Sequence, residues 1–273
     1  MSAETPQLGA RPVRSWTPPP FIASARTRWA LYIGALIYLV LAIGSVEVNW
    51  TRVMLGLERG WAFVQGFMYP DFSSRWGDIA LGFQESLTMT VTSTALGVFL
   101  SIPVAVGASR NLAPTWIYLG CRAFIAASRT LNEIIVAIFL VAMFGFGPFA
   151  GFLTLTFATI GFMAKLMAED IEEIQASQLE ALRATGAGYV QVLDFAVLSQ
   201  VVPRLLGLSL YRLDINFRES AVIGIVGAGG IGATLNTAMD RYEFDSAAAI
   251  LWVIIVIVMF AEYSSGRLRK YIQ

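Results

Sequence analysis

The sequence predicts an all-α, polytopic membrane protein with about six membrane-spanning helices. Hydrophobic residues make up 56% of the 273 residues and charged residues only 14%, whereas soluble domains contain about 25% charged residues. The mean hydropathy is +0.65. In addition, several apolar runs approach or reach the roughly 17–25 residues that a helix needs to cross the hydrocarbon core of a bilayer. An ordinary soluble globule is therefore not expected.

Six apolar runs supply the expected spans. Buried core helices are the alternative, but a soluble protein of this size would not need so many charge-free runs. A cleaved signal peptide is the alternative for the first run, although its leader would be long and contains Pro18, Pro19 and Pro20. In chain order the expected spans are residues 29–48, 87–108, 134–147, 149–168, 201–226 and 247–261.

The chain divides into three expected parts. Residues 1–25 are proline-containing and lack periodicity, which predicts a flexible cytoplasmic tail. Residues 26–83 contain the first transmembrane helix and an outer segment whose aromatic residues are typical of an amphipathic helix at the interface; a plain loop is the alternative for that segment. Residues 84–273 form the core, with a cytoplasmic loop at about 169–199.

The distribution of basic residues predicts the orientation. Arginine and lysine concentrate in alternate segments between the spans, and such residues favour the cytoplasmic side. An even number of spans then places both termini in the cytoplasm. The expected inner basic residues are Arg11, Arg14, Arg26, Arg28, Arg110, Arg122, Arg129, Lys165, Arg183, Arg204, Arg267, Arg269 and Lys270.

The composition excludes several classes of function. The sequence has no histidine, which removes His-ligated zinc sites and histidine-based nucleophile systems. Cys121 is the single cysteine, so no intrachain disulfide or thiolate metal cluster is expected. The net charge is zero, so no nucleic-acid partner is expected. Lys165 and Lys270 are the only lysines and neither follows a P-loop glycine pattern, so any ATP hydrolysis needs another chain.

The loop at about 169–199 contains a helix-forming stretch, then glycines that favour a turn, then a second amphipathic stretch. It resembles the EAA loop of permease subunits in bacterial ABC importers, in which a short coupling helix docks on a separate ATPase. It departs from that pattern at Ala196 and at Ser199, where the family usually has isoleucine and proline. The residues to which this resemblance assigns coupling are Glu180, Ala181, Leu182, Gly186, Ala187 and Gly188.

The resemblance extends downstream. The stretch 208–220 and the glycine run 226–232 are similar to phosphonate importer permeases, whose relatives carry phosphite and hypophosphite. The resemblance covers roughly residues 84–265 and implies a type I ABC importer permease in the bacterial inner membrane. It implies a second copy of the chain, two ATP-binding subunits that bind ATP and Mg²⁺, and an extracytoplasmic substrate-binding protein. It implies no covalent chemistry and no cofactor in this chain. A methionine-type amino-acid importer permease is the alternative.

The glycine run Gly227, Gly229, Gly230 and Gly232 formally satisfies a dinucleotide-binding pattern, so a membrane-associated dinucleotide-binding enzyme is a distant alternative. That function requires a parallel sheet of repeated strand and helix units, and the chain offers one such unit among membrane spans. The preferred interpretation is a backbone break that is covered by protein or faces a water-filled cavity.

Ionisable residues interrupt the fifth span, and such residues usually face a bundle interior or a water path. Asp214 and Arg218 are one helical turn apart, so a structural ion pair is one interpretation. The other is that Arg212 or Arg218 offers paired guanidinium donors to phosphonate-type oxygens. Asn132 and Glu133 either join a gate or cap a helix. The candidate pathway or gate residues are Arg212, Asp214, Asn216, Arg218, Glu219, Asn132 and Glu133.

Overall fold

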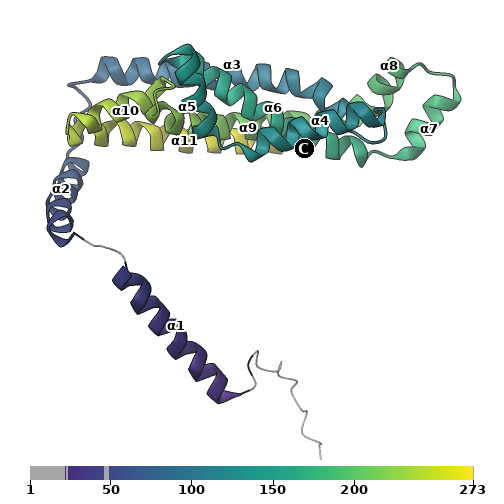
Figure 1. Ribbon diagram of the computed structural model, residues 1–273. Coiled ribbons are helices and arrows are strands. Elements are labelled where there is room, and N and C mark those ends of the chain that lie inside the picture. The colour runs from purple at the N-terminus through teal and green to yellow at the C-terminus, as the bar shows by residue number, and fades with distance from the viewer. Residues whose placement is uncertain (1–21, 23, 46–48, 273) are drawn as a thin grey trace, which may run out of the picture. The chain divides into compact units, whose positions relative to one another are not determined.

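The computed structural model describes residue 22 and residues 24–45 and 49–272 (Figure 1). The predicted cytoplasmic tail therefore lies almost entirely outside the described residues. The chain forms two compact units, Met1–Glu58 and Arg59–Gln273. The first unit contains helix α1 (Ala25–Ser45) and the beginning of α2 (Trp50–Met68). None of the residues of α1 is buried within the protein, as expected for a helix that faces lipid.

The second unit begins within α2 and contains all later helices. Residues 76–107 form one long helix, α3 (Trp76–Gly107), so the span expected from residue 87 starts a full three turns earlier. Only the last residues of the expected outer segment, 76–83, are therefore part of α3. Within this unit the α2 residues Phe63 and Phe67 contact Phe244 and Trp252 of the last helix, with ring centroids 5.7 Å apart in both pairs.

The expected span 134–147 is a shorter helix that follows a sharp break in the chain. Helix α5 (Glu133–Phe144) has 12 residues and is too short to cross a bilayer core alone. Helix α4 (Thr115–Thr130) precedes it, and the two helices together are apolar enough to span but bend by 93° at the break. Helix α4 contains Arg122 and Arg129. A search for charge-free runs therefore did not predict it.

The remaining helices follow without a long connection. Among the described residues, five helices are long and apolar enough to span a membrane, or six if the bent pair counts as one span. The described residues contain helices and no strand, so the predicted all-α class with about six spans is confirmed. The elements after α5 are α6 (Pro148–Glu172), α7 (Ala176–Ala184), α8 (Tyr189–Val192), the π-helix η1 (Leu193–Leu198), α9 (Ser199–Ile225), α10 (Gly230–Asp240) and α11 (Phe244–Ile272).

Helices α3 and α6 form the most extensive helix pair. The small residues Ser93, Gly97, Ser101 and Ala105 recur every fourth position of α3 and are all buried. At Gly97 an added Cβ atom would lie 2.6 Å from Thr159 of α6, so the glycine permits the close approach of the two helices. These small side chains form a packing face on α3.

The second unit has two distinct ends (Figure 1). Helices α7 and α8 lie at one end, and α10 lies at the other. Helix α10 contacts the first turns of α3, where the Ile231 amide donates to the Ser86 hydroxyl over 2.9 Å. The segment around α7 instead joins a core cluster that includes Ala105 and Ala108 at the far end of α3.

Candidate functional site: a coupling loop and a buried arginine network

Helix α7 and the turn after it form the segment for which the sequence predicts docking. Glu180, Ala181 and Leu182 lie in α7, with Glu180 and Ala181 exposed and Leu182 half-buried. Gly186 ends the helix with a φ of +78°, a left-handed conformation that L side chains rarely adopt. The Gly186 amide donates to the Arg183 carbonyl over 3.0 Å. The half-buried Ala187 and the exposed Gly188 complete the turn, and Gly188 is the N-cap of α8.

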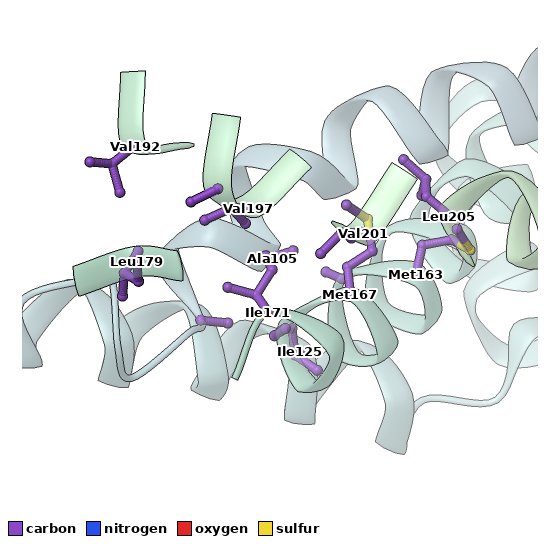
Figure 2. Packing of buried hydrophobic residues seen from close by; sticks show 14 residues of the cluster. Ala105, Ile125, Met163, Met167, Ile171, Leu179, Val192, Val197, Val201 and Leu205 are labelled. Atoms are coloured by element: carbon purple, nitrogen blue, oxygen red, sulfur yellow. The ribbon is translucent and has the colours of Figure 1, made fainter. Parts of the chain in front are cut away.

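The segment is anchored to the bundle by apolar packing (Figure 2). Leu179 of α7 and Val192 of α8 are 7% and 3% exposed, and both belong to one cluster with Ile171 of α6 and Val201 of α9. Burying side chains of this size stabilises the contact by about 1.5–3 kcal/mol each. Packed side chains therefore connect α7 and α8 to α6 and α9.

The loop also exposes apolar side chains that the sequence prediction did not assign. Tyr189, Val190 and Phe195 are 56%, 74% and 66% exposed, and all lie in α8 or η1. Their signal in the sequence was weak, because in an amphipathic stretch they cannot be told from the residues that face the core.

The π-helix η1 connects the loop to α9 and was not predicted. Pro203 has no backbone N–H, and a proline in a helix clashes with the carbonyl four residues before it. Upstream of Pro203, the Ser199 hydroxyl donates to the Phe195 carbonyl and the Gln200 side-chain amide to the Ala196 carbonyl, both over 2.7 Å. These side chains bond to carbonyls of the widened turn, which explains how this segment supports a π-helix.

A buried polar network lies around Arg212, in the middle of α9. The Arg212 side chain is 3% exposed. Its guanidinium binds Glu219 with an N···O distance of 3.1 Å, and a Glu133 oxygen lies 3.9 Å away. It also donates to the Thr159 hydroxyl over 3.2 Å, and it lies 5.2 Å from the centre of the Phe162 ring. Because a buried cation is stable only when it is paired, these contacts fix the Arg212 side chain.

Asn216 extends the network by one helical turn and is completely buried. Its side-chain amide donates to the hydroxyls of Thr94 and Thr159 over 2.8 and 2.9 Å. Thr94 lies in α3 and Thr159 in α6, so the network joins three helices. Neither threonine was predicted, although each is a hydroxyl within an apolar span, and such residues often bond between membrane helices.

A polar cavity of about 310 Å³ opens beside Arg212, at the break between α4 and α5; we refer to it as the Arg212 cavity. Asn132 caps α5, since its side chain accepts a bond from the Ile134 amide over 2.9 Å. Irregular backbone at membrane depth is tolerated where it lines a cavity or is buried in protein. The residues that line the Arg212 cavity are Ser128, Arg129, Thr130, Leu131, Asn132, Glu133, Ala158, Phe162 and Arg212.

Asp214 and Arg218 form an ion pair within α9, so the predicted pairing is present. The Asp214 side chain is 6% exposed and that of Arg218 is 47% exposed. Neither residue lines the Arg212 cavity. Of the two arginines that the sequence singled out, Arg212 is the one whose side chain faces the cavity.

The glycine run lies between α9 and α10, where the backbone turns. Gly227, Gly229 and Gly230 have φ angles of +93°, +76° and +74°. Gly232 lies in α10, where an added Cβ atom would be 1.9 Å from the Ala221 carbonyl oxygen of α9. The run follows a helix rather than a strand, which removes the structural context that dinucleotide binding requires.

The residues 97–273 match the family described as the binding-protein-dependent transport system inner membrane component. The chain belongs to this family. The permease is 37% identical over 243 residues to the phosphite transport system permease protein PtxC of Stutzerimonas stutzeri, a match that covers 89% of this chain and 87% of that protein. It is 42% identical over 202 residues to the phosphate-import permease protein PhnE of Mycolicibacterium smegmatis, covering 74% of this chain and 38% of that longer protein.

A solved structure has the same fold as the permease. The inward-facing MetNI methionine ABC transporter includes a chain with a TM-score of 0.65 and 22% identity, and the match covers 74% of this permease and 99% of that chain. Together with the family match, this fold makes the protein a multi-pass, type I ABC importer permease. Within the described residues, no group of three or more His, Cys, Asp or Glu residues is arranged to hold a metal ion.

Proposed function

We propose that the permease carries a phosphorus oxyanion such as a phosphonate, phosphite or hypophosphite into the cell, as the transmembrane subunit of an ABC importer. The permeases named for phosphite and phosphate import are 37% and 42% identical to it, whereas the probable D-methionine transport system permease protein MetI of Vibrio cholerae is 28% identical. These relatives favour phosphorus oxyanions over methionine. The complex would contain two copies of the permease in the inner membrane, two ATP-binding subunits and an extracytoplasmic binding protein.

The observation that carries the proposed substrate class is the position of Arg212 beside a polar cavity within the membrane. A guanidinium presents paired donors that match the oxygens of phosphorus oxyanions. Glu219 and Thr159 hold the group in place, while Glu133 is more distant and lines the cavity. We assign Arg212 the contact with the passing anion, and Glu133 with Asn132 the role of a gate at the break between α4 and α5.

Coupling is assigned to the cytoplasmic face of α7 and α8. The exposed Glu180 and Ala181 lie beside the turn at Gly186, and the exposed Tyr189, Val190 and Phe195 supply an apolar contact surface. A groove on each ATP-binding subunit would receive this face. ATP and Mg²⁺ would bind to those subunits and not to the permease. Lys165 of the permease forms an ion pair with Glu169 on the same helix. The termini would then lie in the cytoplasm.

Transport by the reconstituted complex tests the substrate class. The permease, its ATP-binding subunits and its binding protein are purified together in mild detergent and placed in proteoliposomes. Uptake of radiolabelled methylphosphonate, phosphite, hypophosphite, phosphate and methionine is then measured with internal ATP. We expect ATP-dependent uptake of at least one phosphorus oxyanion and none of methionine. Methionine uptake without oxyanion uptake would refute the proposal.

Arg212→Lys tests the role of Arg212. This variant keeps a positive charge but loses the planar fork, so we expect oxyanion uptake to fall about 10- to 100-fold, which corresponds to about 1.4–2.8 kcal/mol. Arg122→Lys is the matched control, because Arg122 pairs with Glu172 away from the Arg212 cavity. The amount of assembled complex is measured for both. Wild-type uptake by assembled Arg212→Lys complex would contradict the assignment.

A further inference from the structure

The base of the coupling loop is closed by contacts between α6 and α9. The loop leaves α6 at Glu172 and joins α9 at Ser199. Across this gap, Asp170 and Arg204 form an ion pair with an N···O distance of 3.1 Å. The Gln175 amide also donates to the Gln200 side-chain oxygen over 3.4 Å. The Asp170–Arg204 and Gln175–Gln200 contacts thus join the two ends of the loop where the loop meets the helix bundle.

The Asp170–Arg204 pair is unequal in burial. The Asp170 side chain is 6% exposed, whereas that of Arg204 is 62% exposed. One Asp170 carboxylate oxygen, Oδ2, is buried and has no hydrogen-bond partner among the described residues. Separating a buried carboxylate from its cation is costly, because the charge is left without compensation. Asp170 therefore favours arrangements in which Arg204 stays against it, and this links the end of α6 to the beginning of α9.

The opposite side of the same helical turn is tied to a different part of the bundle. Glu172 pairs with Arg122 of α4 at 2.9 Å and accepts a bond from the Arg110 amide over 2.8 Å. The Asn111 side chain donates to the Ile171 carbonyl over 2.8 Å. The last turn of α6 therefore joins the corner between α3 and α4 on one side and α9 on the other.

We propose that Asp170 and Arg204 are positioning residues for coupling, which pass a displacement of the docked loop to α9 and so to Arg212. This inference rests on the proposed function, because it needs the loop to dock on an ATPase. Apolar packing around Leu179 and Val192 holds the loop against the bundle, but such packing is non-directional. The ion pair adds a directional link, since it joins one point on α6 to one point on α9, eight residues before Arg212 in the sequence.

The chain offers a matched control. Lys165 and Glu169 form an ion pair on the same helix, but their side chains are 37% and 43% exposed and both lie on α6. Exposed pairs of this kind contribute about 0–1 kcal/mol. Lys165→Gln removes a charge near Asp170 without opening the base of the loop.

The experiment measures oxyanion transported per ATP hydrolysed in proteoliposomes, together with ATP hydrolysis in the absence of substrate. The variants are Asp170→Asn, Arg204→Gln, Arg204→Lys and Lys165→Gln, each normalised to assembled complex. We expect Asp170→Asn and Arg204→Gln to lower the transport to hydrolysis ratio at least fivefold and to raise hydrolysis without substrate. We expect Arg204→Lys to stay within twofold of wild type and Lys165→Gln to match it.

A purely structural role gives a different result. Loss of assembled complex in Asp170→Asn and Arg204→Gln, with a wild-type ratio in the complexes that form, would overturn the inference. Failure of all three pair variants to assemble would also overturn it, since the pair would then serve folding. The wild-type complex separates this test from the test of the proposed function. Absence of oxyanion uptake by the wild-type complex refutes the proposed function. An unchanged ratio of transport to ATP hydrolysis in active variants refutes only the coupling role of Asp170 and Arg204.

Discussion

At the residue scale, the two members of the Asp214–Arg218 pair have different surroundings. Asp214 is 6% exposed and its Oδ1 atom is buried without a hydrogen-bond partner among the described residues. Arg218 is 47% exposed. Removing the arginine leaves a buried carboxylate unpaired, whereas removing the carboxylate leaves a cation that reaches the surface. The two single substitutions should therefore have unequal costs.

We expect Arg218→Gln to destabilise the permease by about 2–4 kcal/mol, and Asp214→Asn by about half as much. The double variant should recover most of the loss, because neither substitution then leaves an unpaired buried charge. Thermal unfolding of the detergent-solubilised complex, followed by size-exclusion fluorescence, measures all four forms. Uptake of labelled oxyanion is measured alongside. Additive losses of stability, or a double variant that is stable but inactive, would contradict a purely structural pair.

The sequence identified the charged residues of α9 and the Asp214–Arg218 pair, but not the contacts of α9 with other helices. Spacing of four residues on one helix predicts a contact such as Asp214 with Arg218, because it depends only on helix geometry. The contacts of Arg212 with Thr159 and of Asn216 with Thr94 join different helices. They depend on how α3, α6 and α9 pack, which a residue pattern within one span does not encode.

At the element scale, the turn after α7 tests whether backbone conformation controls coupling. Gly186 has a φ of +78°, and an added Cβ atom would meet nothing within 4 Å. Any effect of substitution therefore comes from conformational strain of about 1–2 kcal/mol and not from a clash. We expect the ratio of transport to ATP hydrolysis to fall in the order Gly, Asn, Ala, Val at this position, because asparagine tolerates the left-handed region and valine does not.

Gly120→Ala is the control for that series. Gly120 lies in α4, outside the loop, and an added Cβ atom there would also meet nothing within 4 Å. We expect this variant to retain the wild-type ratio. Equal loss in Gly186→Asn and Gly186→Val would show that the turn conformation is not the cause.

The sequence predicted the long spanning helices better than it predicted the breaks and irregular turns within them. Long apolar runs gave α3, α6, α9 and α11, because lipid exposure imposes apolar composition over a whole span. The charges in α4 concealed the helix that precedes α5 and bends by 93° from it. The π-helix η1 was also missed, since it depends on bonds from Ser199 and Gln200 to carbonyls that an ordinary helix would pair by itself.

At the scale of the whole molecule, α3 fixes which loops lie on opposite sides of the membrane. Its 32 residues extend roughly 48 Å, which exceeds a hydrocarbon core of about 30 Å. Ser73 lies before the first residue of α3. Ser177 lies in α7, whose Leu179 belongs to the same buried cluster as Ala105 and Ala108 at the other end of α3. The fold therefore requires Ser73 and Ser177 to be on opposite sides, and the basic residues decide which side is the cytoplasm.

Cysteine labelling tests the crossing of α3 and the orientation of the protein separately. Cys121 contacts the α7 end of α3 near Gly107, and Cys121→Ser removes the single native thiol. At position 73 a cysteine keeps the turn, because the backbone amides of residues 73 and 74 donate to the Asp71 carboxylate over 2.8 and 3.3 Å. In the wild-type protein, bonds from the side chains and amides of Ser73 and Ser74 hold the pKa of Asp71 well below its usual range. An aspartate with an ordinary pKa is also charged at neutral pH, so the loss of the Ser73 hydroxyl leaves this acceptor charged during labelling.

We expect an impermeant maleimide to label Ser73→Cys at least tenfold more than Ser177→Cys in intact cells, because the basic segments place α7 in the cytoplasm. Permeabilised cells provide the control, in which both cysteines should react. Equal labelling in intact cells would contradict the crossing of α3. Labelling of Ser177→Cys alone would preserve the fold but reverse the orientation; α7 would then face away from cellular ATP, and the coupling role of Gly186, Asp170 and Arg204 would be refuted.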